Sequence, residues 1–232
     1  MIRKVRERRH LALLMALVVA AVVEPLSVDF SAGTQIIGGI VVVTITLGVF
    51  LIVFERRWER RLAFVMVAFI LGGNIGHEAL PERFQVGEIM YHCFAAVFLA
   101  FAVAVILERI FQRQTIRSDD VIGALCGYLL AAAAWANAYA LTYLLWPGSF
   151  RVTDAIASRL GDWHLQRFFF GYFSVMTLTG LGYPDITPTA TPSYSLSWLE
   201  SVFGQFYIAV VVAQLVGLRL AEVIKRNRPD SR

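Results

Sequence analysis

Residues 177–185 read TLTGLGYPD, a stretch in which two glycines stand among bulky residues directly after an aromatic, apolar segment. The stretch lies between two long apolar runs, residues 121–146 and residues 196–224. Glycine lets a backbone turn its carbonyl groups inward without a side-chain clash. At membrane depth, irregular backbone is tolerated only where it is buried in protein or lines a water-filled cavity. The stretch therefore predicts a lining element inside a membrane protein.

The composition agrees with a membrane environment. The chain has 232 residues, of which 58% are hydrophobic, and its net charge is +4, whereas soluble domains are about 45–50% apolar. Basic residues lie between apolar runs, so we expect them to meet anionic membrane lipids rather than nucleic acid. The two cysteines, Cys93 and Cys126, lie inside apolar runs and form neither a disulfide framework nor a metal motif.

Six apolar runs have the length that crosses a bilayer core about 30 Å thick. They cover residues 11–28, 34–54, 62–80, 87–111, 121–146 and 196–224. The first run follows a basic stretch, as in a signal peptide, but no clear small-residue cleavage site follows it, so we expect a retained anchor. The sequence predicts an all-α membrane protein with six transmembrane helices.

The connections between these runs alternate between rich and poor in basic residues. Arginines follow the second and fourth runs, and further basic residues lie in both tails. The positive-inside rule then places both termini in the cytoplasm. Because the tails have no room for a large domain, we expect a multi-pass protein of a bacterial inner membrane.

The connection between the last two runs is not a simple loop. Residues 165–176 (LQRFFFGYFSVM) are apolar and aromatic but too short to cross the bilayer, which predicts a re-entrant pore helix. A Thr-, Gly- and Pro-rich stretch, residues 177–192, follows and predicts an extended strand. Two regions result: residues 1–120 with four helices, and residues 121–232 as a pore domain.

The stretch 177–185 resembles the Thr-x-Thr-Thr-Val-Gly-Tyr-Gly-Asp signature of potassium channels. The matching positions, without a gap, are Thr177, Thr179, Gly182, Tyr183 and Asp185, and Leu181 replaces the valine. Outside the stretch, Tyr172 and Phe173 fall where that family places an aromatic pair behind the filter. Gly204 falls where many members carry a hinge in the inner helix. The resemblance covers about residues 121–226.

The resemblance implies a homotetrameric cation channel that conducts K⁺ or another monovalent cation, with no enzymatic activity and no cofactor. The expected ion-binding filter residues are Thr179, Gly180, Leu181, Gly182 and Tyr183. The expected filter supports are Tyr172, Phe173, Thr177, Pro184, Asp185 and Glu200, and the candidate gating hinges are Gly204 and Gly217. A close helix contact through a small residue is the alternative for each hinge, and a solvated interfacial acid is the alternative for Glu200.

Two positions depart from the signature. Gly180 replaces its second threonine, which removes a ring of hydroxyl ligands. Pro184 replaces its last glycine, and proline fixes φ near −65° and has no N–H group. An alternative function is therefore a non-conducting membrane sensor or channel subunit that retains the pore fold. A transporter or membrane enzyme is disfavoured, since the sequence shows no second broken helix and no paired carboxylates at depth.

The first four runs carry no motif. The fourth has no lysine or arginine in its interior, so we expect no steep voltage gating. A cluster around the third outer loop, which comprises His77, Glu78, Glu82, Glu88 and His92, is interpreted as solvated loop residues, with a proton- or metal-sensing site as the alternative. Asn137 and Gln205 are expected to bridge helices or face the cavity.

Overall fold

The computed structural model describes residues 9–27, 34–79, 85–112, 118–182 and 185–226. The long helices are α2 (Arg9–Ser27), α3 (Thr34–Val53), α4 (Arg57–Ala79), α5 (Gln85–Phe111), α6 (Ser118–Leu145), α8 (Trp163–Leu178) and α9 (Thr191–Arg226). The short elements are β1 (Phe150–Val152), α7 (Asp154–Ala157) and β2 (Ile186–Pro188). The predicted all-α class is confirmed, and each of the six apolar runs lies in its own helix.

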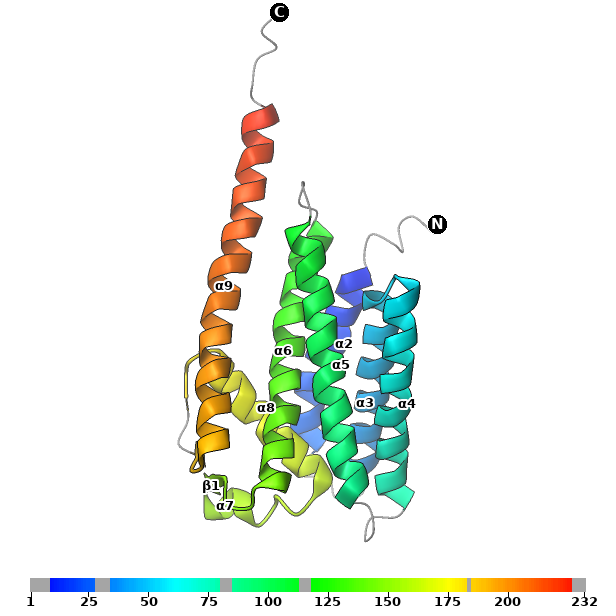
Figure 1. Cartoon of the computed structure of the whole chain (residues 1–232), viewed down its shortest axis with the longest axis vertical. Coiled ribbons are helices and arrows are strands. Elements are labelled where there is room, and N and C mark those ends of the chain that lie inside the picture. Colours follow the sequence, from blue (N-terminus) through cyan, green and yellow to red (C-terminus); the bar gives the residue numbers. More distant parts are fainter. Residues whose placement is uncertain (1–8, 28–33, 80–84, 113–117, 183–184, 227–232) are drawn as a thin grey trace, which may run out of the picture.

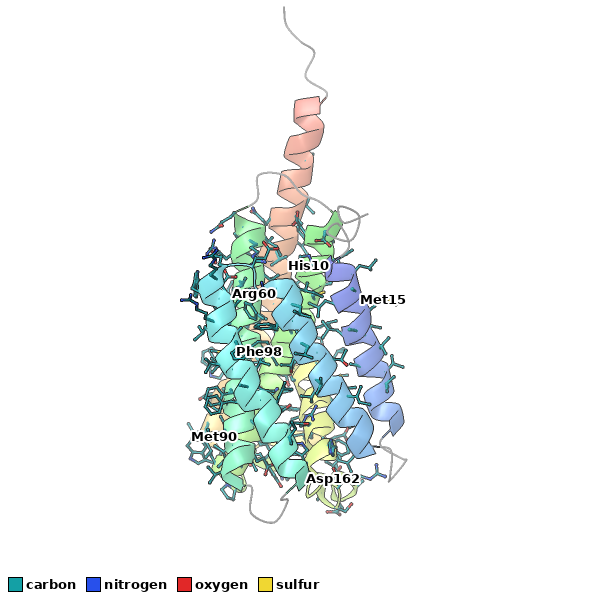
Figure 2. All side chains as sticks on the ribbon, turned by 90° about the vertical axis from the view of Figure 1, so that its right-hand side faces the viewer. His10, Met15, Arg60, Met90, Phe98 and Asp162 are labelled. Carbon is teal, nitrogen blue, oxygen red and sulfur yellow. The ribbon has the colours of Figure 1, made fainter. Side chains whose placement is uncertain are left out.

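The long helices other than α8 run alongside one another in alternating directions (Figure 1). The beginning of α2 and the end of α9 lie at the same end of the bundle, and α9 projects beyond the other helices. The connection that contains β1 and α7 lies at the opposite end. Figure 2 shows the same polarity in its labelled side chains, with His10 and Arg60 toward one end and Asp162 at the other.

Three helical stretches in the described part of the chain are long and apolar enough to cross a membrane. They are Val86–Phe111, Asp119–Leu145 and Thr191–Gly217. Two shorter apolar stretches, His10–Val23 and Gly39–Val53, lie in α2 and α3. The chain therefore has the helices of a membrane protein, and the count of six spans stays a prediction.

The core is divided into two parts. The larger part joins α2 through α6, with Val49, Phe98 and Leu130 among its fully buried side chains. The smaller part is aromatic and fixes α8 against α6 and the strand pair. Its rings meet edge to face, as in the pair of Tyr139 and Phe173, whose centroids lie 4.9 Å apart. Such ring pairs contribute more stability than the burial of their apolar area alone, so they fix the position of α8.

The strands β1 and β2 form an antiparallel pair in which Phe150 lies opposite Pro188. One backbone hydrogen bond continues the pairing, from the N–H of Thr153 to the carbonyl of Asp185 (3.1 Å). Next to the pair, the Ser193 hydroxyl donates to the carbonyl of Ser149 (2.6 Å). These bonds tie the chain before α8 to the chain after it.

The opposite end of the bundle is held by ion pairs. Glu59, whose side chain is 1% exposed, accepts hydrogen bonds from the backbone N–H groups of Glu55 and Arg56 and from Arg109 on α5 (3.1 Å). The carboxylate therefore satisfies free N–H groups at the start of α4 and joins α4 to α5. Two of the arginines expected to meet membrane lipids, Arg56 and Arg109, pair with acids of the protein.

Candidate functional site

Helix α8 carries the candidate site at its C-terminal end. The helix starts cleanly because the Asp162 carboxylate accepts hydrogen bonds from the backbone N–H groups of His164 (2.8 Å) and Leu165 (3.1 Å). The sequence predicted a half-helix over residues 165–176, and the structure extends it by two residues at each end. In Figure 1, α8 runs part of the way along the bundle, and α9 begins again near the end from which α8 started.

The chain after α8 is not the extended strand expected to begin at residue 177. Thr177 and Leu178 still belong to the helix, and a turn follows. The N–H of Gly180 bonds to the carbonyl of Thr177 (3.1 Å), and the N–H of Gly182 bonds to the carbonyl of Met176 (3.2 Å). The expectation is wrong for residues 177–180, which are helix and turn because the helix-end hydrogen bonds continue past residue 176, and for Thr191 and Pro192, which already belong to α9.

Gly180 and Gly182 have positive φ angles of 76° and 62°. Gly180 directly follows the C-cap residue Thr179. The position after the C-cap is where helices often end in a residue of left-handed conformation. A threonine here would meet the steric penalty that glycine avoids. Helix capping therefore accounts for the glycine that stands where the channel signature has a threonine.

The last carbonyls of α8 meet hydroxyl groups of neighbouring helices. The Tyr128 hydroxyl on α6 donates to the carbonyl of Leu178 (3.2 Å), and the Ser201 hydroxyl on α9 lies 3.3 Å from the carbonyl oxygen of Thr177 and 3.0 Å from that of Ser197. The following residues are exposed, and Leu181 has 68% of its surface accessible. A capped helix end thus leads into an exposed loop that two other helices hold in place.

Helix α9 approaches this loop through one face. A Cβ atom added at Gly204 would lie 2.0 Å from the carbonyl oxygen of Leu178. One residue further along, the Gln205 amide nitrogen lies 3.3 Å from the position of a Cβ at Gly180. Gly204 is therefore a close-contact glycine, which was the alternative to a hinge, and a hinge there stays a prediction. A Cβ atom added at Gly217 would meet nothing within 4 Å.

Glu200 lies behind α8 and is fully buried. The Tyr139 hydroxyl on α6 donates to Oε2 (2.5 Å), and the Ser174 hydroxyl on α8 lies 2.5 Å from Oε1. Glu200 is thus not the solvated interfacial acid kept as its alternative, and it joins three helices. The sequence analysis missed Tyr139 and Ser174; the signal for them was that a buried carboxyl group needs hydroxyl or N–H donors nearby.

The expected filter supports occupy two places. Phe173 is buried in the aromatic core beneath α8, and the Tyr172 hydroxyl donates to Asp185 Oδ2 (3.3 Å). The hydroxyl of Thr177 donates to the carbonyl of Phe173 (2.8 Å), and that of Thr179 donates to the carbonyl of Val175 (2.7 Å). These contacts orient the chain on both sides of the loop.

The expected filter residue Tyr183 and the expected filter support Pro184 lie outside the described residues. Among the candidate sensor residues, Glu82 lies outside them as well, and nothing is described of the side chains of His77 and Glu78. His92 is not a solvated loop residue: it is fully buried and its Nδ1 lies 2.9 Å from Asn137 Oδ1. Asn137 bridges two helices, as one of its expectations stated.

No protein family, curated protein or solved structure matches the chain. Within the described residues, no group of three or more metal-ligating side chains is present either.

Proposed function

We propose that the chain is a membrane cation channel, with K⁺ as the expected permeant ion, in which four copies surround one conduction path. The observation that carries the proposal is the exposed loop with two positive-φ glycines directly after the C-terminal end of α8. A helix C-terminus carries partial negative charge, which attracts a cation. Backbone carbonyls after such an end can replace an ion's hydration shell.

The oligomer follows from the geometry of a single loop. One loop presents carbonyl groups on one side only, so a closed ring of ligands needs further copies. Helix α9 offers a surface for them, because several of its large apolar side chains are exposed, including Trp198 (57%) and Phe206 (64%). Lipids and the neighbouring copies would cover this face.

Flux measurements test the proposal. The protein is reconstituted in liposomes under a K⁺ gradient, with Na⁺ measured in parallel. Gly182→Ala is expected to abolish flux, since an added methyl group at a φ of 62° distorts the loop. Gly148→Ala is the matched control: Gly148 also has a positive φ (81°) but lies in the connection before β1, so its flux should stay near that of the unmodified protein.

Other results of the flux measurements would change or contradict the proposal. Equal K⁺ and Na⁺ flux would retain the channel and remove the selectivity. Absence of any flux would favour a non-conducting sensor or subunit. The capping role of Gly180 supports this alternative, because helix capping explains the presence of the glycine without a bound ion. A monomer in native mass measurements would contradict the shared path.

A further inference from the structure

A cavity of about 140 Å³ lies inside the bundle, away from the candidate filter. Its wall comes from α3, α4, α5, α6 and α8, and most of it is aliphatic or aromatic, as at Val42, Phe98 and Leu99. Its polar side includes His92, Asn137 and Arg167. An engineered apolar cavity of about 150 Å³ in another protein admits benzene, so this one has the size for a molecule of roughly six to eight heavy atoms.

The hydrogen bond to Asn137 shows which ring nitrogen of His92 carries the proton. Asn137 uses its amide nitrogen to donate to the carbonyl of Ala133 (2.8 Å), which leaves its Oδ1 facing His92 Nδ1 (2.9 Å). Nδ1 must then carry the hydrogen, and in a neutral imidazole the other nitrogen is an acceptor. Within the described part of the chain, this buried Nε2 has no hydrogen-bond partner. A buried acceptor of this kind favours a ligand that brings a donor.

Among the described residues that line the cavity, Arg167 carries the only formal charge. It comes from α8 and its guanidinium lies 5.8 Å from the centre of the Tyr91 ring. A hydroxyl group suits the pair of polar groups, since its O–H can donate to Nε2 of His92 while its oxygen accepts from the guanidinium. A carboxylate offers acceptors only and would leave Nε2 without a donor.

We propose that the cavity is a binding site for a small, largely apolar molecule with one hydroxyl group, such as a phenol or a short alcohol. The aliphatic wall would hold the body of the ligand, and His92 with Arg167 would hold its hydroxyl group. Part of the wall, from α3, α4 and α5, lies in the region of the chain to which the channel proposal assigns no role, and the rest comes from α6 and α8. Binding can be measured without ion flux, so the two proposals succeed or fail separately.

Phenol is the probe, and the fluorescence of Trp163 reports its binding, because the indole ring lies 4.9 Å from the His92 ring. Trp163→Phe identifies the part of the signal that comes from this residue. Toluene has the shape of phenol without the hydroxyl group, and benzoate carries a carboxylate. We expect saturable binding of phenol at least about tenfold tighter than that of toluene or benzoate, because a missing partner for a buried polar group lowers affinity.

Variants then place the binding in the cavity. Gly171 lines it from α8 and has open space where a Cβ would be, so Gly171→Leu should fill the cavity and abolish phenol binding. Gly72→Leu is the matched control, since Gly72 on α4 also has open space but is not part of the wall. His92→Phe should make phenol and toluene bind alike.

Three results would overturn the proposal. Equal binding of phenol and toluene to the unmodified protein would remove the role of His92. Unchanged phenol binding in Gly171→Leu would remove the cavity as the site. Tighter binding of benzoate than of phenol would replace the hydroxyl class with a carboxylate. Because a Cβ at Gly171 meets nothing within 4 Å, the Gly171→Leu test stands even if His92→Phe does not fold.

Discussion

Glu200 shows how the contacts of one residue define its protonation state. The Ser174 oxygen lies 2.7 Å from the carbonyl oxygen of Ala132 and 2.5 Å from Glu200 Oε1. A serine hydroxyl has one hydrogen and cannot donate to both oxygens. Both contacts are hydrogen bonds only if Glu200 carries a proton and donates to Ser174, whose own hydrogen goes to Ala132. The geometry therefore fits a neutral carboxylic acid.

Two substitutions at Glu200 test this state. Glu200→Gln keeps a donor and an acceptor in place, so we expect the free energy of unfolding to change by less than about 1 kcal/mol. Glu200→Ala leaves the Tyr139 hydroxyl without its acceptor and opens a cavity, at a cost of about 3 kcal/mol. Thermal denaturation in detergent measures both. A large loss in Glu200→Gln would mean that an ionised carboxylate is required.

Sequence reasoning found the buried acid and its approximate place, but not its partners. Intramembrane acids are rare enough to stand out in a hydropathy pattern, which is why Glu200 was selected. Tyr139 and Ser174 carry no such signal, because each is an ordinary residue of an apolar run and becomes important only when α6, α8 and α9 meet. The same holds for Tyr128, whose hydroxyl reaches the end of α8.

At the scale of elements, the contact between α8 and α9 positions the candidate loop. The end of α8 touches α9 at Gly204, where a hydrogen in place of a side chain lets the helix approach the carbonyl of Leu178. A closer approach by one helix allows Ser201 and Gln205 of the same face to reach the loop region. One small residue thereby brings this face of α9 against the end of α8.

Gly204→Ala tests this contact. The new methyl group would lie 2.0 Å from a backbone oxygen, so α9 must shift, and we expect a loss of about 2 kcal/mol or more in unfolding free energy. Gly217→Ala is the control, since nothing lies within 4 Å and alanine favours a helix by up to about 1 kcal/mol. Denaturation midpoints in detergent compare the two. If Gly204→Ala left the stability unchanged, the close-contact role would be contradicted and a gating hinge at Gly204 would be the favoured interpretation.

The helices themselves were largely predictable, since long apolar runs separated by polar turns mark them directly. The half-helix was also found, with its ends off by two residues. The expected strand failed at its start for a local reason. The Thr-, Gly- and Pro-rich composition suggested an extended backbone, whereas helix-end hydrogen bonds to Met176 and Thr177 extend the helical turn.

At the scale of the whole molecule, the bundle has two unlike ends. The end with the ion pairs around Glu59 carries the start of α2 and the end of α9, and the other end carries β1 and α7. The positive-inside rule predicts that the first end faces the cytoplasm. The alternating helices of Figure 1 are compatible with that orientation.

Cysteine labelling tests the orientation. In a background with Cys93→Ser, a membrane-impermeant maleimide should label Ser158→Cys in intact cells and should label Arg60→Cys only after lysis. Both positions are exposed, and Cys126 is buried and serves as an unlabelled internal reference. Labelling of both positions from the same side would contradict the proposed topology.

The hydrogen bonds at the end of α8 also set an order for synthesis. The carbonyl of Leu178 is bonded by a helix made earlier, at Tyr128, and that of Thr177 is bonded locally by the N–H of Gly180, but the contact with Ser201 on α9 forms later. During translation the segment that follows α8 therefore leaves the ribosome before its second support exists. Its final shape can be reached only after α9 has been synthesised and has packed against the chain that precedes it.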